Sequence, residues 1–203
     1  AEKIETDQLI NELKNVDGIL IPGGFGYRGV EGKIQAIKFA RENDIPFFGI
    51  CLGMQLSVIE ISRNLMGKQD SNSTEFKTSN NPVVSLMTEW NNENKTEKRD
   101  LTSDKGGTMR LGSYRAVLKK GSKIHNIYNS DEISERHRHR YEVDLSYTRD
   151  FEKKGFHFSG MSPDNILPEV IESVNHKWFI GVQFHPELKS RPLAPHPLFS
   201  SFI

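Results

Sequence analysis

The chain has 203 residues, of which 35% are hydrophobic and 27% are charged, and its 27 lysines and arginines balance its 27 aspartates and glutamates. This length predicts one domain, or at most two small ones. Zero net charge argues against a protein that binds nucleic acid or an anionic membrane surface, because such proteins usually carry a basic excess. The sequence has no apolar run of about 18 residues and no secretory signal at its start, so we expect a soluble, cytoplasmic protein.

The first half of the chain alternates between apolar runs and helical patterns. Residues 18–21 form a short apolar run that stops at the glycine-rich segment 22–26, which predicts a buried strand followed by a loop. Residues 31–43 have helical spacing, 45–50 are a second apolar run, and 52–67 return to helical spacing. Strands and helices that alternate in this way predict crossover connections and a parallel sheet.

The second half of the chain is less regular. Residues 89–105 are rich in Asn, Lys, Glu and Asp, and we expect a solvated, flexible polar insertion there. Residues 109–124 predict a strand and a turn, and residues 133–144 predict a polar stretch that ends as a strand. Two late strands are expected within 155–173 and 176–188.

The segment before Val16 has the pattern of a polar helix. A doubly wound sheet normally begins with a strand, so the first strand of the sheet is expected to be missing from this sequence. The predicted fold class is α/β, with a mostly parallel central sheet flanked by helices on both faces.

Cys51 is the single cysteine, and it lies between the apolar run that ends at Ile50 and the helix that begins near Leu52. A side chain on a tight strand-to-helix turn is presented clear of the sheet, and small neighbours such as Gly49 and Gly53 relieve crowding there. Free N–H groups at the start of the helix favour a thiolate, and that of Leu52 is placed to bind an oxyanion. The alternative is a buried core cysteine, which is the commoner role of a lone cysteine.

His185 is the best placed of the seven histidines to act as a base for this sulfur. It follows the apolar run 179–184 and precedes Pro186 and Glu187, so a carboxylate that can fix its tautomer lies two residues away. Strand ends of this kind meet at the carboxyl edge of one sheet. Together with Cys51 the pattern favours acyl transfer, whereas His-Pro-Glu by itself also suits a surface turn.

The glycine-rich segment 22–26 offers backbone N–H groups, above all that of Gly24, to an oxyanion hole. A phosphate-binding loop is the competing interpretation. The lysine and the serine or threonine that end a nucleotide-binding loop are absent, which disfavours it.

Residues 136–140 read Arg-His-Arg-His-Arg. Interleaved arginines repel a cation, so we expect no metal site there. The cluster suits a carboxylate or phosphate ligand held by guanidinium groups, or it is a solvated basic edge.

Several motifs together resemble a known family. PGGFG (22–26), GICLGMQ (49–55) and QFHPE (183–187) are similar to the three signatures of the class I, triad-type glutamine amidotransferases, whose Cys-His-Glu site releases ammonia from glutamine. STEF, GGTMRLG and RHRHRYEV extend the similarity to the glutaminase domain of the CTP synthase family. The resemblance runs from about Val16 to Ile203 and implies a flavodoxin-like sheet.

The resemblance implies a role for each matching residue. The nucleophile corresponds to Cys51, the base to His185 and the supporting carboxylate to Glu187, and the backbone N–H groups of Gly24 and Leu52 correspond to the oxyanion hole. The glutamine-binding positions fall on Gly24, Leu52, Gly53, Met54, Gln55, Glu75 and Arg140. The Glu75 carboxylate suits the ammonium group of glutamine, and Arg140 suits its carboxylate.

The resemblance also implies partners. Residues 1–203 would form a glutaminase domain without a cofactor of its own. Its ammonia would pass to a synthetase (amidoligase) domain, absent from this sequence, that aminates UTP to CTP with ATP and Mg²⁺ and responds to GTP. L-Glutamine and that domain are the expected partners. An amidotransferase of another pathway, a stand-alone γ-glutamyl hydrolase and a non-catalytic interaction or regulatory module remain alternatives.

Overall fold

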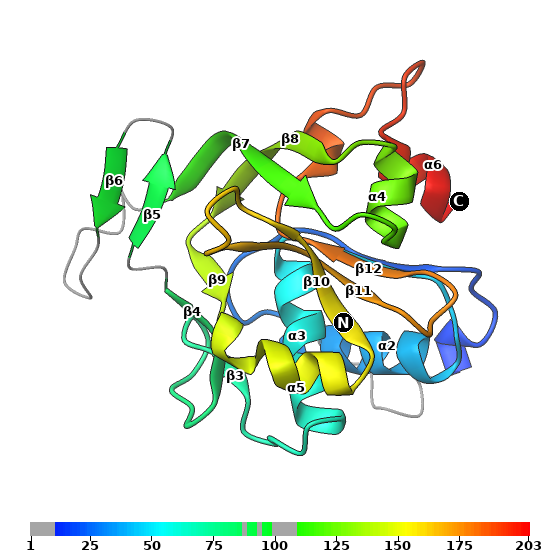
Figure 1. Cartoon of the computed structure of the whole chain (residues 1–203). Helices are drawn as coiled ribbons and strands as arrows, with labels where there is room; N and C mark the ends of the chain where they lie inside the picture. The colour runs from blue at the N-terminus through cyan, green and yellow to red at the C-terminus, as the bar shows by residue number, and fades with distance from the viewer. Residues whose placement is uncertain (1–10, 87–88, 93–94, 99–108) are drawn as a thin grey trace.

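The computed structural model describes residues 11–86, 89–92, 95–98 and 109–203. Its central sheet has seven strands in the order β1-β2-β12-β11-β10-β7-β8 (Figure 1). The parallel neighbours are β1 (Ile19–Ile21), β2 (Phe47–Ile50) and β12 (Phe179–Val182). The antiparallel part consists of β11 (Pro168–Ser173), β10 (Phe156–Met161), β7 (Arg110–Leu118) and β8 (Glu132–His139).

The α/β class is confirmed, but parallel pairing is limited to β1, β2 and β12, which is less than the mostly parallel sheet that the sequence predicts. The connections 162–167 and 174–178, on either side of β11, hold six and five residues. A crossover between parallel strands needs a dozen or more residues, so these strands pair in the antiparallel sense. β1 is the first strand in the described part of the chain, and the part of the predicted amino-terminal helix in residues 1–10 lies outside it.

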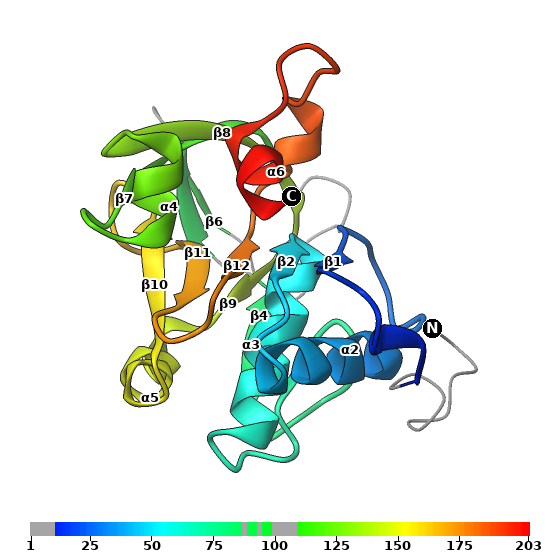
Figure 2. The same cartoon turned by 90° about the vertical axis from the view of Figure 1, so that its right-hand side faces the viewer.

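Helices cover both faces of the sheet, as Figure 2 shows. One face carries α2 (Val30–Glu42), α3 (Leu52–Asn64) and α5 (Thr148–Lys153), and the other carries α4 (Lys123–Tyr128) and α6 (Pro197–Phe202). One cluster of buried apolar side chains fills each interface. No helix in the described ranges has the length and hydropathy that crossing a bilayer requires.

A small second sheet packs against α3. It contains β3 (Asn72–Ser73), β4 (Pro82–Leu86) and β9 (Tyr141–Val143), and the short helices η2 (Leu145–Tyr147) and η3 (Pro186–Leu188) complete the fold. The insertion predicted at 89–105 includes an antiparallel hairpin of β5 (Glu89–Asn92) and β6 (Lys95–Lys98), where a loop was expected. Residues 93, 94 and 99–105 of that insertion lie outside the described residues.

The polar stretch predicted at 133–144 is strand β8 followed by β9. Side chains alternate along β8, so that Arg136 and Arg138 are exposed while His137 and His139 are buried, each at 2% exposure. The buried imidazoles contact each other, with His137 Nδ1 2.9 Å from His139 Nε2. The two arginines thus form the solvated basic edge. The described residues include no group of three His, Cys, Asp or Glu side chains placed to hold a metal ion.

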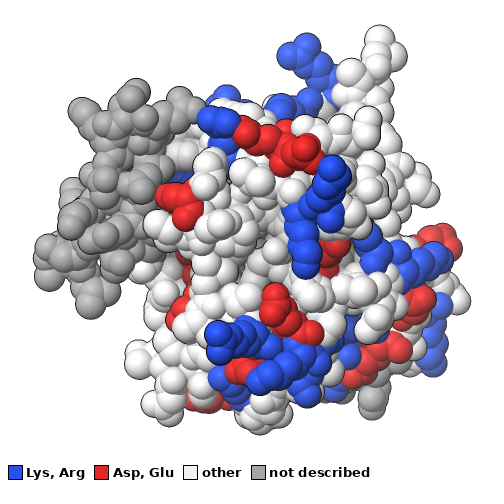
Figure 3. Space-filling view, in the orientation of Figure 1, with Lys and Arg blue, Asp and Glu red and all other residues white. Residues whose placement is uncertain are grey.

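Positive and negative side chains lie intermixed on the face of the molecule shown in Figure 3. On this face, therefore, positive and negative side chains balance one another locally, as they do in the composition of the whole chain.

Candidate active site

Cys51 occupies a sharp turn between β2 and α3. Its φ of 51° and ψ of −101° lie in a region that side chains rarely adopt. The Cys51 N–H donates to the carbonyl of Val182 over 2.7 Å, which ties the turn to β12, and the residue is 2% exposed. This turn is the strand-to-helix elbow that the sequence predicts.

Two glycines make the elbow possible. A Cβ built at Gly49 would lie 2.7 Å from the carbonyl carbon of Gly53, and one built at Gly53 would lie 2.2 Å from the carbonyl oxygen of Ile21. Both distances are below 3.0 Å, and the atom that an added Cβ would meet is a backbone atom in each case. A backbone atom cannot change rotamer to relieve such a clash. Helix α3 therefore packs at backbone contact on β1 and β2, and only glycine fits at these two positions.

His185 borders the same glycine as Cys51. A Cβ built at Gly23 would lie 2.7 Å from His185 Cε1 and 3.6 Å from Cys51 Cβ. His185 Nδ1 is 2.6 Å from Glu187 Oε1, whereas its Nε2 is buried without a hydrogen-bond partner among the described residues. One nitrogen of the imidazole is held and the other is available, which is the arrangement that a general base requires.

The surroundings of the Cys51 sulfur favour the thiol over the thiolate. Burial raises the pKa of the thiol to about 12, and the hydrogen bond from the Leu52 N–H opposes this only in part. The charges of Glu142, Glu187 and Glu75 contribute to this rise. The start of α3 favours the thiolate as predicted, but the loss of hydration on burial opposes it more strongly than one backbone donor supports it. Attack on a substrate requires a base to remove the proton.

Glu187 is negatively charged near neutral pH. Burial acts to raise the pKa of its carboxyl group, but the hydrogen bond and the charge of His185 contribute to a pKa below the ordinary value. A carboxylate in this position stabilises the imidazolium that forms when His185 accepts a proton.

Glu75 and Arg140 carry opposite charges, and both act on Tyr141. Glu75 Oε1 accepts a hydrogen bond of 2.8 Å from the Gly26 N–H, which joins the segment after β3 to the glycine-rich loop. Arg140 Nε is buried and has no hydrogen-bond partner within the described part of the chain. Burial and then the charge of Glu75 raise the pKa of Tyr141 while Arg140 opposes them, so both charged groups act on one side chain. This pair suits the two charged ends of an amino acid.

The remaining predicted positions fall into three groups. Gly24 and Leu52 are neighbours, since a Cβ built at Gly24 would lie 3.2 Å from Leu52 Cδ2. Gly53 packs on β1 and Met54 is fully buried in the core, so these two can meet a ligand only through their main chain. The Gln55 side chain belongs to a buried hydrogen-bond network, where its Nε2 donates to the carbonyl of Tyr141 over 2.9 Å.

Gln183 is the first residue of the QFHPE motif, but the sequence assigns it no role of its own. It is fully buried, and its Nε2 donates to Cys51 Sγ over 3.7 Å. It directly follows strand β12, in the segment that also carries His185. Its place two residues before His185 is therefore the signal in the sequence that could have identified it.

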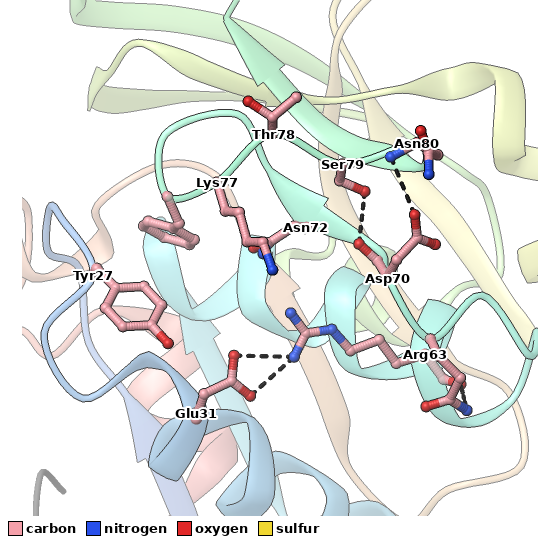
Figure 4. A pocket seen from close by; sticks show the side chains of 11 residues that line it. Tyr27, Glu31, Arg63, Asp70, Asn72, Lys77, Thr78, Ser79 and Asn80 are labelled. Carbon is pink, nitrogen blue, oxygen red and sulfur yellow. Dashed lines mark hydrogen bonds and ion pairs between the residues drawn. The ribbon is translucent and has the colours of Figure 1, made fainter.

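A separate pocket of about 610 Å³ lies outside this site (Figure 4). Its wall includes Tyr27 and Phe76, each next in sequence to a partner in the Gly26–Glu75 hydrogen bond. Two of its four charged side chains, Arg63 and Glu31, form an ion pair at 2.9 Å. Neither Cys51 nor His185 lines it.

The chain is similar to known proteins in both sequence and shape. The sequence matches the family model of glutamine amidotransferase class-I over residues 2–203. A CTP synthase of Paramagnetospirillum magneticum is 58% identical over 203 residues, and one of Brucella anthropi is 60% identical over 203 residues. Each match covers 100% of this chain but only 38% of the relative.

A solved structure of similar shape is that of the Trypanosoma brucei CTPS glutaminase domain with bound acivicin. It is 41% identical, has a TM-score of 0.85, and the match covers 97% of this chain and 73% of that one. The predicted flavodoxin-like class is thereby confirmed. The chain belongs to the class I glutamine amidotransferases and, among them, to the glutaminase domains of CTP synthases.

Proposed function

We propose that this chain hydrolyses L-glutamine to glutamate and ammonia, with Cys51 as nucleophile, His185 as base and Glu187 as its supporting carboxylate. The observation that carries the proposal is the buried, unpartnered Nε2 of His185 beside the elbow on which Cys51 stands. Family membership supports the same reaction.

The chemistry follows from the position of each group. Cys51 Sγ attacks the carbon of the side-chain amide while His185 Nε2 accepts the thiol proton. The N–H groups of Gly24 and Leu52 stabilise the oxyanion, and His185 returns the proton to the departing nitrogen. Ammonia leaves a γ-glutamyl thioester on Cys51. Water, deprotonated by His185, then hydrolyses the thioester, which frees glutamate and restores the thiol.

The charged pair orients the substrate. We assign the Glu75 carboxylate to the ammonium group of glutamine and the Arg140 guanidinium, whose Nε lacks a partner among the described residues, to the α-carboxylate. Main-chain groups of residues 52–55 complete the glutamine site in this proposal.

Glu75→Ala is expected to raise the KM for glutamine by about 10- to 100-fold, because a hydrogen bond to a charged group contributes about 1.5–3 kcal/mol. The value of kcat should change less, since Glu75 does not touch the reacting amide. Steady-state release of ammonia measures both constants.

Glu75→Gln is the matched control, because it keeps an acceptor for the Gly26 N–H and removes only the charge. It should raise the KM nearly as much as alanine does. The assignment of Glu75 to the ammonium group would be overturned if Glu75→Gln kept the wild-type KM. It would also be overturned if Glu75→Ala lowered kcat and left the KM unchanged.

We further propose that the ammonia serves the ATP-dependent amination of UTP to CTP. The support is that the relatives from Paramagnetospirillum magneticum and Brucella anthropi are CTP synthases. This chain spans 38% of the length of each. In this proposal a synthetase domain of the same enzyme holds ATP, Mg²⁺ and UTP, and GTP acts only when that domain is present. ATP and UTP are cytoplasmic metabolites, so we place the reaction in the cytoplasm.

Isotope transfer tests this second step in the whole enzyme. Glutamine labelled with ¹⁵N in its side-chain amide, supplied with UTP, ATP and Mg²⁺ in an excess of unlabelled ammonium, should give CTP that carries ¹⁵N in its amino group. Unlabelled CTP would show that the ammonia made at Cys51 is not delivered to the synthetase domain.

A further inference from the structure

The side chain of Gln183, just after the end of β12, contacts the sulfur of Cys51. It follows Val182, the last residue of that strand, and its side chain is fully buried. The Gln183 N–H donates to the carbonyl of Glu169 over 2.9 Å, which fixes its main chain to the neighbouring strand β11. Its Nε2 lies 3.7 Å from Cys51 Sγ, within the longer distance of a hydrogen bond to sulfur.

The orientation of the Gln183 amide is determined by its neighbours. Gln55 Nε2 donates to the carbonyl of Tyr141, which can only accept, so the end of Gln55 that meets Gln183 is an N–H₂ group. That group lies 3.1 Å from the Gln183 side chain, and two amide nitrogens facing each other would repel. The oxygen of Gln183 therefore faces Gln55, and its N–H₂ group faces the sulfur.

A donor at this sulfur opposes the effect of burial. Burial disfavours the charged form of Cys51, and hydrogen bonds to that form favour it. The Leu52 N–H reaches the sulfur from the start of α3, and Gln183 reaches it from β12. The two donors together also limit the directions in which the side chain can turn.

We propose that Gln183 is a positioning residue of the nucleophile, whose amide holds the Cys51 sulfur and stabilises its thiolate while Gln55 and the Tyr141 carbonyl hold the amide. The inference rests on the proposed role of Cys51 as nucleophile. It adds a link to the glutamine site, since Tyr141, the first residue of β9, directly follows Arg140 in the chain.

Two variants of Gln183 separate the effect of its hydrogen-bond donor from the effect of its size and shape. Gln183→Met fills the space without any donor. Gln183→Glu keeps an acceptor for Gln55, donates to the sulfur while its carboxyl is protonated, and presents a negative charge once it ionises. Gln35→Met and Gln35→Glu, at a partly exposed position of α2, make the same chemical changes away from the site.

The test is the rate at which iodoacetamide alkylates Cys51, followed by intact mass from acidic to mildly alkaline pH. The 203-residue chain has one cysteine, so a single adduct reports this sulfur. Gln183→Met should react about tenfold more slowly than the wild type at every pH, since one lost hydrogen bond shifts a pKa by about one unit. Gln183→Glu should match the wild type at acidic pH and fall behind it as pH rises.

Three other charged groups act on the sulfur, namely Glu75, Glu142 and Glu187. Every variant contains them, so their effects cancel in the ratio of alkylation rates. Thermal unfolding verifies that each variant is folded. A wild-type rate in Gln183→Met, or equal slowing of both variants at every pH, would overturn the proposal. Iodoacetamide alkylates the thiol without binding at a glutamine site, so either of these results would contradict the role of Gln183 alone. Failure of the wild-type protein to release ammonia from glutamine would instead contradict the proposed function.

Discussion

Replacing Cys51 by alanine is expected to lower glutamine hydrolysis by at least about 10⁴-fold while the protein stays folded. No other thiol exists in the chain, and the thioester cannot form without one. Alanine fits the same backbone conformation as cysteine, because both carry a single Cβ at the φ of 51°. The lost sulfur costs on the order of 1 kcal/mol, so the unfolding midpoint should fall by only about 2–4 °C.

The measurement is ammonia release at saturating glutamine, beside thermal unfolding of the same sample. Cys51→Ser is the matched control, since it keeps a hydroxyl nucleophile of far lower reactivity and should also be strongly impaired. Hydrolysis by Cys51→Ala within tenfold of the wild-type rate would contradict the assigned mechanism.

Gly53→Ala is expected to cost more than about 4 kcal/mol of folding free energy, or to prevent folding. The added Cβ would lie 2.2 Å from the carbonyl oxygen of Ile21, so α3 must move away from β1 and the elbow at Cys51 must move with it. Denaturant unfolding measures the loss directly.

Gly67→Ala is the matched control for this substitution. Gly67 has a φ of 73° and nothing within 4 Å of an added Cβ, so only backbone strain of about 1 kcal/mol is expected there. A loss in Gly53→Ala no larger than that in Gly67→Ala would contradict the close packing of α3 on the sheet.

The sequence predicts the parallel strands and the elbow because local signals determine both. The apolar runs, the glycines and the helical spacing around Cys51 all indicate one structure, and the structure agrees with them. Strand β8 is different, because its buried face is made of polar side chains such as His137 and His139. It therefore lacks the alternation of apolar and polar residues by which a strand is usually identified.

The protonation state of Cys51 and the role of Gln183 depend on contacts between distant parts of the chain. The raised pKa of the thiol comes from burial under several elements, which a local motif does not show. Gln183 lies 132 residues from the sulfur that it contacts, and its amide is oriented by Gln55. Neither effect follows from a residue and its sequence neighbours alone.

The most direct test of the central claim is the intact mass of the protein after treatment with a glutamine analogue that carries a diazoketone in place of the side-chain amide. Wild-type protein should gain one keto-thioether adduct on Cys51 as the diazo group leaves as N₂, and excess glutamine should slow its formation. Cys51→Ala should gain none. An adduct on Cys51→Ala, or a wild-type protein that stays unmodified, would contradict the identification of Cys51 as the nucleophile of a glutamine site.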